Sequence, residues 1–189
     1  MVRRLKQMPS GDVLLFAEAT RLRLFPPLRA AWARRGQQAV VPVSGRKDRR
    51  VLFGAFHPRT AQRIVVQSER ETGPGARALL AEWRRRDRAA PTIWVLLDRG
   101  PAHTAAPTQR LAAQLNMQLI WLPKPWPEWN AMDQWWRELK HLVAVHRQPE
   151  SVEHLAQQAE SWLLELSPQE ALRKAGVWSG KFWLKHWLP

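Results

Sequence analysis

Cysteine is absent from the 189-residue sequence, which excludes disulfide bonds, thiolate metal sites and cysteine nucleophiles. Long apolar runs are absent as well, since none approaches the roughly 20 residues that a membrane-spanning helix needs. The basic N-terminal stretch MVRRLKQMPSGD contains no apolar segment of the kind found in signal peptides. We therefore expect a cytoplasmic protein without a membrane partner.

Acidic residues are few relative to basic ones, with 16 Asp and Glu against 30 Lys and Arg and a formal net charge of +14. Such an excess favours a polyanionic partner, because each phosphate that Lys or Arg neutralises releases counterions. A basic surface that is only solvated is the alternative. Hydrophobic residues make up 45% of the chain, which argues against general disorder and suffices for one domain with a core. These features predict a folded, nucleoid-associated protein that binds nucleic acid.

The hydrophobic pattern predicts an α/β fold. Short apolar runs bounded by turn residues predict strands at 13–16, 39–43, 51–56, 63–67, 92–97 and 117–121. Apolar residues at helical spacing predict helices at 76–83, 104–115, 132–143 and from 152 onward, the last capped by Ser151. The strand–helix–strand unit between 92 and 121 requires parallel pairing with a right-handed crossover. We expect antiparallel strands first, then this unit, then C-terminal helices.

Three carboxylates stand at the ends of these elements. Asp98 ends the run TIWVLLD, and Asp133 begins a helix in PEWNAMDQWWRELK, with 34 residues between them. Glu18 is expected just past the end of the first strand. Because ligands collect at the C-terminal ends of strands in open α/β sheets, the three carboxylates would meet there and hold two Mg²⁺ or Mn²⁺ ions. Taken singly, each also fits a solvated side chain, a turn former or a charge at a helix N-terminus.

Four stretches carry a family resemblance, and they occur in the order LLFAEATRLRLFPPLRAAWARRG, VLFGAF, WVLLDRGPAHTA and LIWLPKPWPEWNAMDQWWRELK over residues 12 to 145. Together they resemble the DDE transposases of the mariner superfamily, in the branch of bacterial insertion sequences, which are DDE superfamily endonucleases. The resemblance implies an RNase H-like fold, with three antiparallel strands and then parallel strands in a mixed central sheet flanked by helices. It also implies DNA cleavage and strand transfer that depend on two Mg²⁺ or Mn²⁺ ions.

The resemblance assigns roles to the three carboxylates. Asp98 matches the family's second catalytic aspartate, and Asp133, at the family's spacing, matches its third acidic residue. Glu18 stands where the first aspartate is expected, in FAEA instead of Phe-x-Asp-Glu. The extra methylene moves the carboxylate on the order of 1 Å, and a misplacement of that size can cost about 100-fold in rate. The site therefore either adapts around Glu18 or belongs to a decayed relic that only binds DNA non-specifically; an interaction protein on the same scaffold ranks below both.

Basic and aromatic residues near the motifs are candidates for DNA contacts. The residues expected to touch phosphates, which position DNA without reading its sequence, are Arg21, Arg99, Lys124, Arg137 and Lys140. Trp126 and Trp129 either belong to the core or stack on an unpaired base. His103, in the family's PAH element, either structures its loop or takes part in catalysis.

The matched stretches predict three regions: a basic lead at 1–11, the catalytic domain at 12–147, and a C-terminal helical extension packed on it at 148–189. Full transposases of this kind carry N-terminal helix-turn-helix domains that read the transposon ends, and this sequence begins just before the first predicted strand. We expect transposon-end and target DNA as partners. A second copy of the chain and a separate DNA-reading chain are further candidates, and a fragment, a second reading frame and a relic all stay open.

Overall fold

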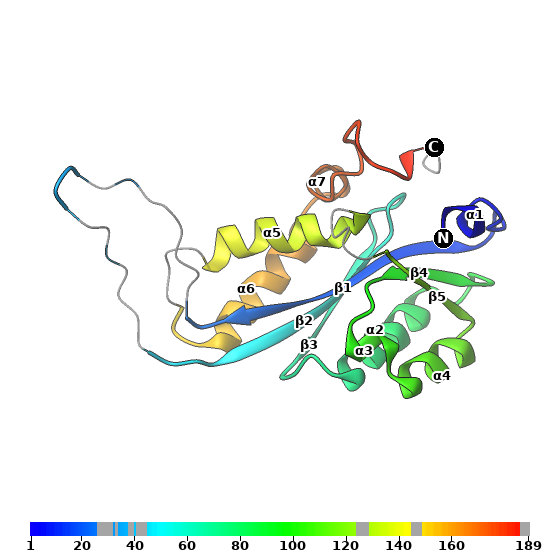
Figure 1. The fold of residues 1–189 in the computed structure, drawn as a ribbon, viewed down its shortest axis with the longest axis horizontal. Helices are drawn as coiled ribbons and strands as arrows, with labels where there is room; N and C mark the ends of the chain where they lie inside the picture. The colour runs from blue at the N-terminus through cyan, green and yellow to red at the C-terminus, as the bar shows by residue number, and fades with distance from the viewer. Residues whose placement is uncertain are drawn as a thin grey trace.

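A computed structural model describes residues 1–25, 32, 34–37, 40, 45–123, 129–144 and 149–185 (Figure 1). The strands of this part are β1 (Val13–Arg23), β2 (Arg49–Phe56), β3 (Arg63–Ser68), β4 (Ile93–Leu97) and β5 (Met117–Trp121). Its helices are α1 (Val2–Leu5), α2 (Gly73–Arg86), α3 (Pro101–Thr104), α4 (Ala106–Gln114), α5 (Ala131–Ala144), α6 (Val152–Glu165) and α7 (Pro168–Lys174). Among the described residues, no helix has the length and apolar character needed to cross a membrane.

The strands form one mixed sheet with the order β3-β2-β1-β4-β5. The first three strands run antiparallel to one another, whereas β4 lies parallel to β1 and β5 lies parallel to β4. The connection from β4 to β5 passes through α3 and α4, as the strand–helix–strand pattern predicted. All residues of β4 are buried, which is typical of a central strand covered on both faces. The predicted mixed α/β sheet is confirmed.

Helices cover both faces of this sheet. Figure 1 shows α5, α6 and α7 on one side and α2, α3 and α4 on the other. Side chains of β1 alternate between the two cores, because successive residues of a strand point to opposite faces. Leu14 and Phe16 pack in the core that contains α5 and α6, whereas Leu15 and Ala17 pack in the core that contains α2. By this alternation Glu18 faces α5.

The first strand is longer than predicted. The polar side chain of Glu18 interrupts the apolar run, and we therefore expected the strand to end before it. In the structure β1 has 11 residues and ends at Arg23. Its whole second half pairs with β2, and the last pair is Arg23 with Arg49. The prediction that Glu18 lies beyond the strand end is wrong: Glu18 lies inside β1, opposite Gly54 of β2.

Two helix predictions can be compared with the structure. The helix predicted at 104–115 is present as α4, which begins two residues later than predicted because Ala105 is extended (φ −56°, ψ 132°) between α3 and α4. Pro107 lacks the N–H that would continue the first helix, and it stands in the first turn of the second one. The predicted cap of α6 is confirmed, since Ser151 Oγ accepts a hydrogen bond from the His154 amide at 3.0 Å. The strand predicted at 39–43 falls outside the described residues, apart from Val40.

Candidate active site

Glu18 and Asp98 lie at the same level of neighbouring strands. Phe16 of β1 is the register partner of Leu96 of β4, and each carboxylate stands two residues further along its chain. Because parallel strands advance in equal steps, this register places Glu18 beside the point where β4 ends. Asp98 is the first residue after that end, at Leu97. The expectation that these two strands are central neighbours is confirmed.

Asp133 approaches from α5, where it lies in the first turn. This helix packs against β1 and β2, and Gly54 lets it do so. A Cβ atom at Gly54 would lie 2.5 Å from Met132 Cε and 2.7 Å from a Trp136 ring carbon. Since Gly54 is also the register partner of Glu18, the missing side chain brings the start of α5 close to that carboxylate.

The Glu18 carboxyl group is surrounded by other negative charges. Burial raises its pKa from 4.5 to about 8, and the charges of Asp98, Asp133 and Glu71 act in the same direction, against the charge of Lys140. Asp98 and Asp133 thus both disfavour the ionised form of Glu18. Glu71, from the segment between β3 and α2, is an acidic neighbour that the sequence did not single out.

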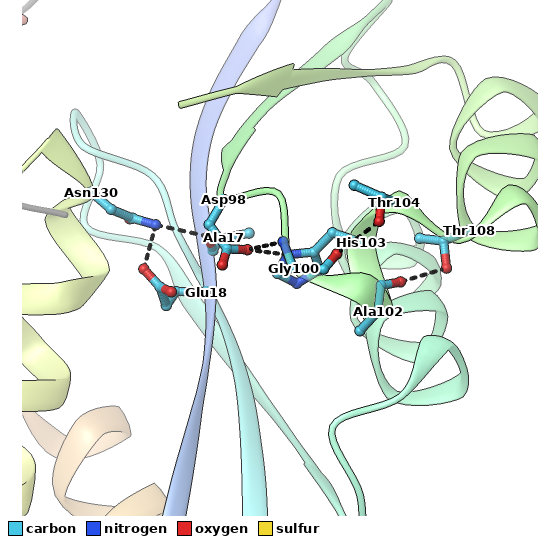
Figure 2. A network of polar contacts seen from close by, with 9 residues as sticks. All are labelled: Ala17, Glu18, Asp98, Gly100, Ala102, His103, Thr104, Thr108 and Asn130. Carbon is cyan, nitrogen blue, oxygen red and sulfur yellow. Dashed lines mark hydrogen bonds and ion pairs between the residues drawn. The ribbon is translucent and has the colours of Figure 1, made fainter. Parts of the chain in front are cut away.

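Asn130 contacts the Glu18 carboxylate directly (Figure 2). Its Nδ2 group donates to Glu18 Oε2 at 2.7 Å and to the Ala17 carbonyl oxygen at 3.0 Å. Its Oδ1 atom accepts a hydrogen bond from the Met132 amide at 3.1 Å, which is the bond of a helix N-cap. No role was expected for Asn130, although an Asn directly before an amphipathic helix is a capping signal that could have identified it.

Asp98 is held by its own loop, as Figure 2 shows. Its Oδ1 atom accepts from the Gly100 amide at 3.0 Å and lies 2.7 Å from His103 Nδ1. An ionised carboxylate only accepts, so Nδ1 is the donor. The side chain of His103 is 6% exposed and that of Asp98 is 53% exposed, so a buried imidazole holds an open carboxylate. Beyond structuring its loop, His103 thus has a defined contact with a candidate ligand.

Basic residues accompany Asp133 along α5. Arg137 Nη2 lies 2.8 Å from Asp133 Oδ2, one turn further along the helix. Lys140 is half-buried; burial lowers its pKa, while the charges of Asp133 and Glu18 raise it. Asp133, Arg137 and Lys140 therefore lie on one face of α5, as predicted.

The remaining candidates for DNA contact stand in different environments. Arg21 Nε forms an ion pair with Glu71 Oε2 at 2.5 Å, and Arg99 is exposed directly after the second candidate ligand. Lys124 and Trp126 lie outside the described residues. Phosphate contact through Arg21 would therefore compete with its ion pair.

The C-terminal segment supports the start of α5. The rings of Trp129 and Trp183 stack at a centroid distance of 5.0 Å and an interplanar angle of 22°, and Trp183 Nε1 donates to the Trp129 carbonyl oxygen at 2.9 Å. Trp135 Nε1 of α5 donates to the Ala171 carbonyl oxygen of α7, also at 2.9 Å. One face of Trp129, which we considered as a base-stacking platform, is covered within the chain.

The candidate ligands suit a hard divalent cation by their chemistry. Within the described ranges, no three Asp, Glu or His side chains are close enough together to hold a metal ion as they stand. Each candidate carboxylate instead contacts its own polar partner, as described above. Their oxygen atoms are nevertheless the ligands that Mg²⁺ prefers, and a cation would offset the burial and the neighbouring charges that raise the Glu18 pKa.

Comparisons with known proteins identify the family of this chain. Residues 13–156 match the family described as DDE superfamily endonuclease. The chain belongs to this family. It is also similar to an uncharacterized 39 kDa protein of insertion element IS630 from Shigella sonnei, with 24% identity over 156 residues that cover 82% of this chain and 46% of that protein. The resemblance stated from the motifs is therefore confirmed, and the chain spans about half the length of this relative.

Solved structures of the Mos1 transposase share the fold of this DDE endonuclease domain. The Mos1 paired-end complex with the left transposon end matches with a TM-score of 0.68 and 14% identity, over 92% of this chain and 54% of that chain. A Mos1 paired-end complex with Mg matches equally, with a TM-score of 0.68 and 13% identity, over the same shares. The catalytic domain of the Mos1 mariner transposase alone matches with a TM-score of 0.63 and 13% identity, over 92% of this chain and 80% of that chain. The predicted RNase H-like fold is confirmed.

Proposed function

We propose that this chain is the catalytic domain of an insertion-sequence transposase, which cleaves DNA and transfers strands with two Mg²⁺ or Mn²⁺ ions held by Glu18, Asp98 and Asp133. The observation that carries the proposal is the register that sets Glu18 of β1 level with Asp98 at the end of β4, together with the packing of α5, which holds Asp133 in its first turn, against β1. Family membership supports the reaction class. The Mos1 structures in complex with transposon-end DNA and with Mg support the partner and the cofactor.

The residues of the chain prepare the site for this reaction. When bound, the ions would activate a water molecule or a 3′-hydroxyl group and stabilise the leaving oxygen of the phosphodiester. Arg137 and Lys140 lie on the same helix face as Asp133 and would neutralise DNA phosphates beside the ions. Arg99, exposed directly after Asp98, would contact a phosphate at the β4 end of the site.

The proposed partners are transposon-end and target DNA, in the nucleoid. A second copy of this chain and a separate DNA-reading chain complete the proposed assembly. The net charge of +14 supports the DNA partner, because such a charge attracts polyanions. The greater length of the matched relatives supports an additional DNA-reading component.

A nicking assay on supercoiled DNA tests the proposal. The wild-type protein is expected to nick DNA with Mg²⁺ or Mn²⁺ and not with EDTA. Asp98→Asn keeps an acceptor for His103 but removes the charge, and it should reduce nicking by more than about 100-fold, since even residues that only orient metal ligands cost about 10- to 100-fold. Glu165→Gln, at an exposed carboxylate on α6, is the matched control and should leave nicking unchanged. Nicking that survives Asp98→Asn would refute the site.

A second candidate function is DNA binding by a decayed enzyme. The observation that favours it is the glutamate at position 18, which is one methylene longer than the aspartate expected there. In this case the wild-type protein would shift DNA in a gel without nicking it, and only Glu18→Asp would nick. Equal or lower activity of Glu18→Asp compared with wild type would exclude this candidate.

A further inference from the structure

Asn130 connects the elements that carry the first and third candidate ligands. It is 1% exposed, and its Nδ2 group donates to Glu18 Oε2 at 2.7 Å and to the main chain of β1 at Ala17. On its other side, Oδ1 accepts the Met132 amide, and the carbonyl oxygen of Asn130 accepts the Asp133 amide at 3.0 Å. One residue thus holds a side chain on β1, as Figure 2 shows, and also fixes the first turn of α5.

We propose that Asn130 is a positioning residue that sets the Glu18 carboxylate relative to Asp133 for metal binding; the inference rests on the proposed function. A glutamate side chain has three rotatable bonds, and once it is ionised, neighbouring carboxylates repel it. The hydrogen bond from Nδ2 holds one oxygen atom of Glu18 and leaves the other for an ion. Because the same amide caps α5, the two ligands keep a fixed relation to each other.

The length of the Glu18 side chain matches this contact. The Asn130 bond is made by Oε2, the terminal oxygen of a side chain that is one methylene longer than aspartate. An aspartate at position 18 would draw its carboxylate back toward β1, away from the Asn130 amide. Asn130 is therefore the residue that accommodates glutamate at this position, and its effect on metal binding should depend on that glutamate.

A purely structural role makes a different prediction. If Asn130 only caps α5 and bridges it to β1, its replacement lowers stability by the same amount whichever acid stands at position 18. Asn130→Ser keeps the cap, because serine is a good N-cap, but its hydroxyl group is too short to replace the bonds to Glu18 and to Ala17. The comparison between the two acids at position 18 then separates the roles. Asn130→Thr, which also caps and fills more of the buried site, is a second variant.

The test measures Mn²⁺ affinity by isothermal titration without DNA, together with thermal unfolding in EDTA. Asn130→Ser is expected to weaken Mn²⁺ binding by about 10- to 100-fold, and also to lower the unfolding temperature because it loses the buried bond to the Ala17 carbonyl oxygen. In the Glu18→Asp background the same substitution should change the affinity less than about twofold, since a double-mutant cycle isolates the contact. Asn130→Thr should follow the same pattern.

Two outcomes would overturn the inference. Either the loss of Mn²⁺ affinity is equal in the wild-type and Glu18→Asp backgrounds, or Asn130→Ser binds Mn²⁺ as tightly as the wild type. Mn²⁺ binding that is lost in Asp98→Asn but kept in Asn130→Ser would overturn this inference alone. A wild-type protein that binds no Mn²⁺ would overturn the proposed function, and the inference with it.

Discussion

The metal-free protein is expected to lose stability as the pH rises, because of Glu18. The pKa of this carboxyl group is about 8 in the folded protein, against an ordinary value of 4.5. The folded state therefore binds the proton more tightly than the unfolded chain does. The resulting contribution to stability is fully present below the unfolded pKa and is lost as the pH rises through the folded pKa. Since one pKa unit corresponds to about 1.4 kcal/mol, the loss is on the order of 5 kcal/mol.

Glu18→Gln is the variant that isolates this effect. Glutamine keeps the shape of the side chain and can still accept the Asn130 hydrogen bond, but it does not titrate. Urea unfolding in EDTA, between about pH 5 and pH 9, gives the free energy of unfolding of both proteins. The variant should gain several kcal/mol relative to the wild type across this range, because other titrating groups cancel in the difference. A difference that stays constant with pH would refute the assignment of a buried, repelled carboxyl group.

Metal binding should reverse this behaviour. A cation favours the ionised carboxylate, so binding of Mn²⁺ near neutral pH should release about one proton per chain in the wild type and none from this position in Glu18→Gln. Isothermal titration in two buffers with different ionisation enthalpies measures the number of released protons. Equal proton release by the two proteins would show that Glu18 is ionised before metal binds.

Three contacts around the site have consequences of their own. Gly54→Ala places a Cβ against the helix above it, which should lower the free energy of unfolding by about 1–3 kcal/mol in urea and reduce nicking; unchanged values of both would contradict the packing argument. His103→Leu removes the donor to Asp98 and should weaken Mn²⁺ binding by about 10- to 100-fold in titrations, whereas unchanged affinity would leave His103 a structural role only. Trp183→Ala removes the stack on Trp129 and one hydrogen bond, which should destabilise the protein by about 2 kcal/mol in urea; a loss of nicking without a loss of stability would point to a direct role.

Local patterns made much of the fold predictable. Buried central strands such as β4 are short apolar runs bounded by turn residues, which makes them recognisable in the sequence. Ser151 indicates the start of α6 because an N-cap depends only on residues a few positions away. The strand–helix–strand spacing fixed the parallel pairing of β4 and β5. Asp98 and Asp133 could be identified from local patterns as well. Asp98 follows the apolar run that forms β4, and Asp133 lies at the start of the helical pattern that forms α5.

The length of β1 was not predictable in this way. The sequence around Glu18 loses its apolar pattern, yet the strand continues because β2, from a later part of the chain, supplies hydrogen-bond partners along it. Strand pairing of this kind depends on tertiary context more than on the residues of the strand.

Sequence alone therefore determined the family, the α/β order of elements and the identity of the candidate carboxylates, because motif and periodicity are properties of neighbouring residues. Only the tertiary structure decided how these carboxylates are held. Asn130 meets Glu18 across 112 positions of the chain, and Gly54 admits α5 because of side chains that approach it from another element. Such contacts arise from packing between distant segments, and no local pattern records which side chains will meet.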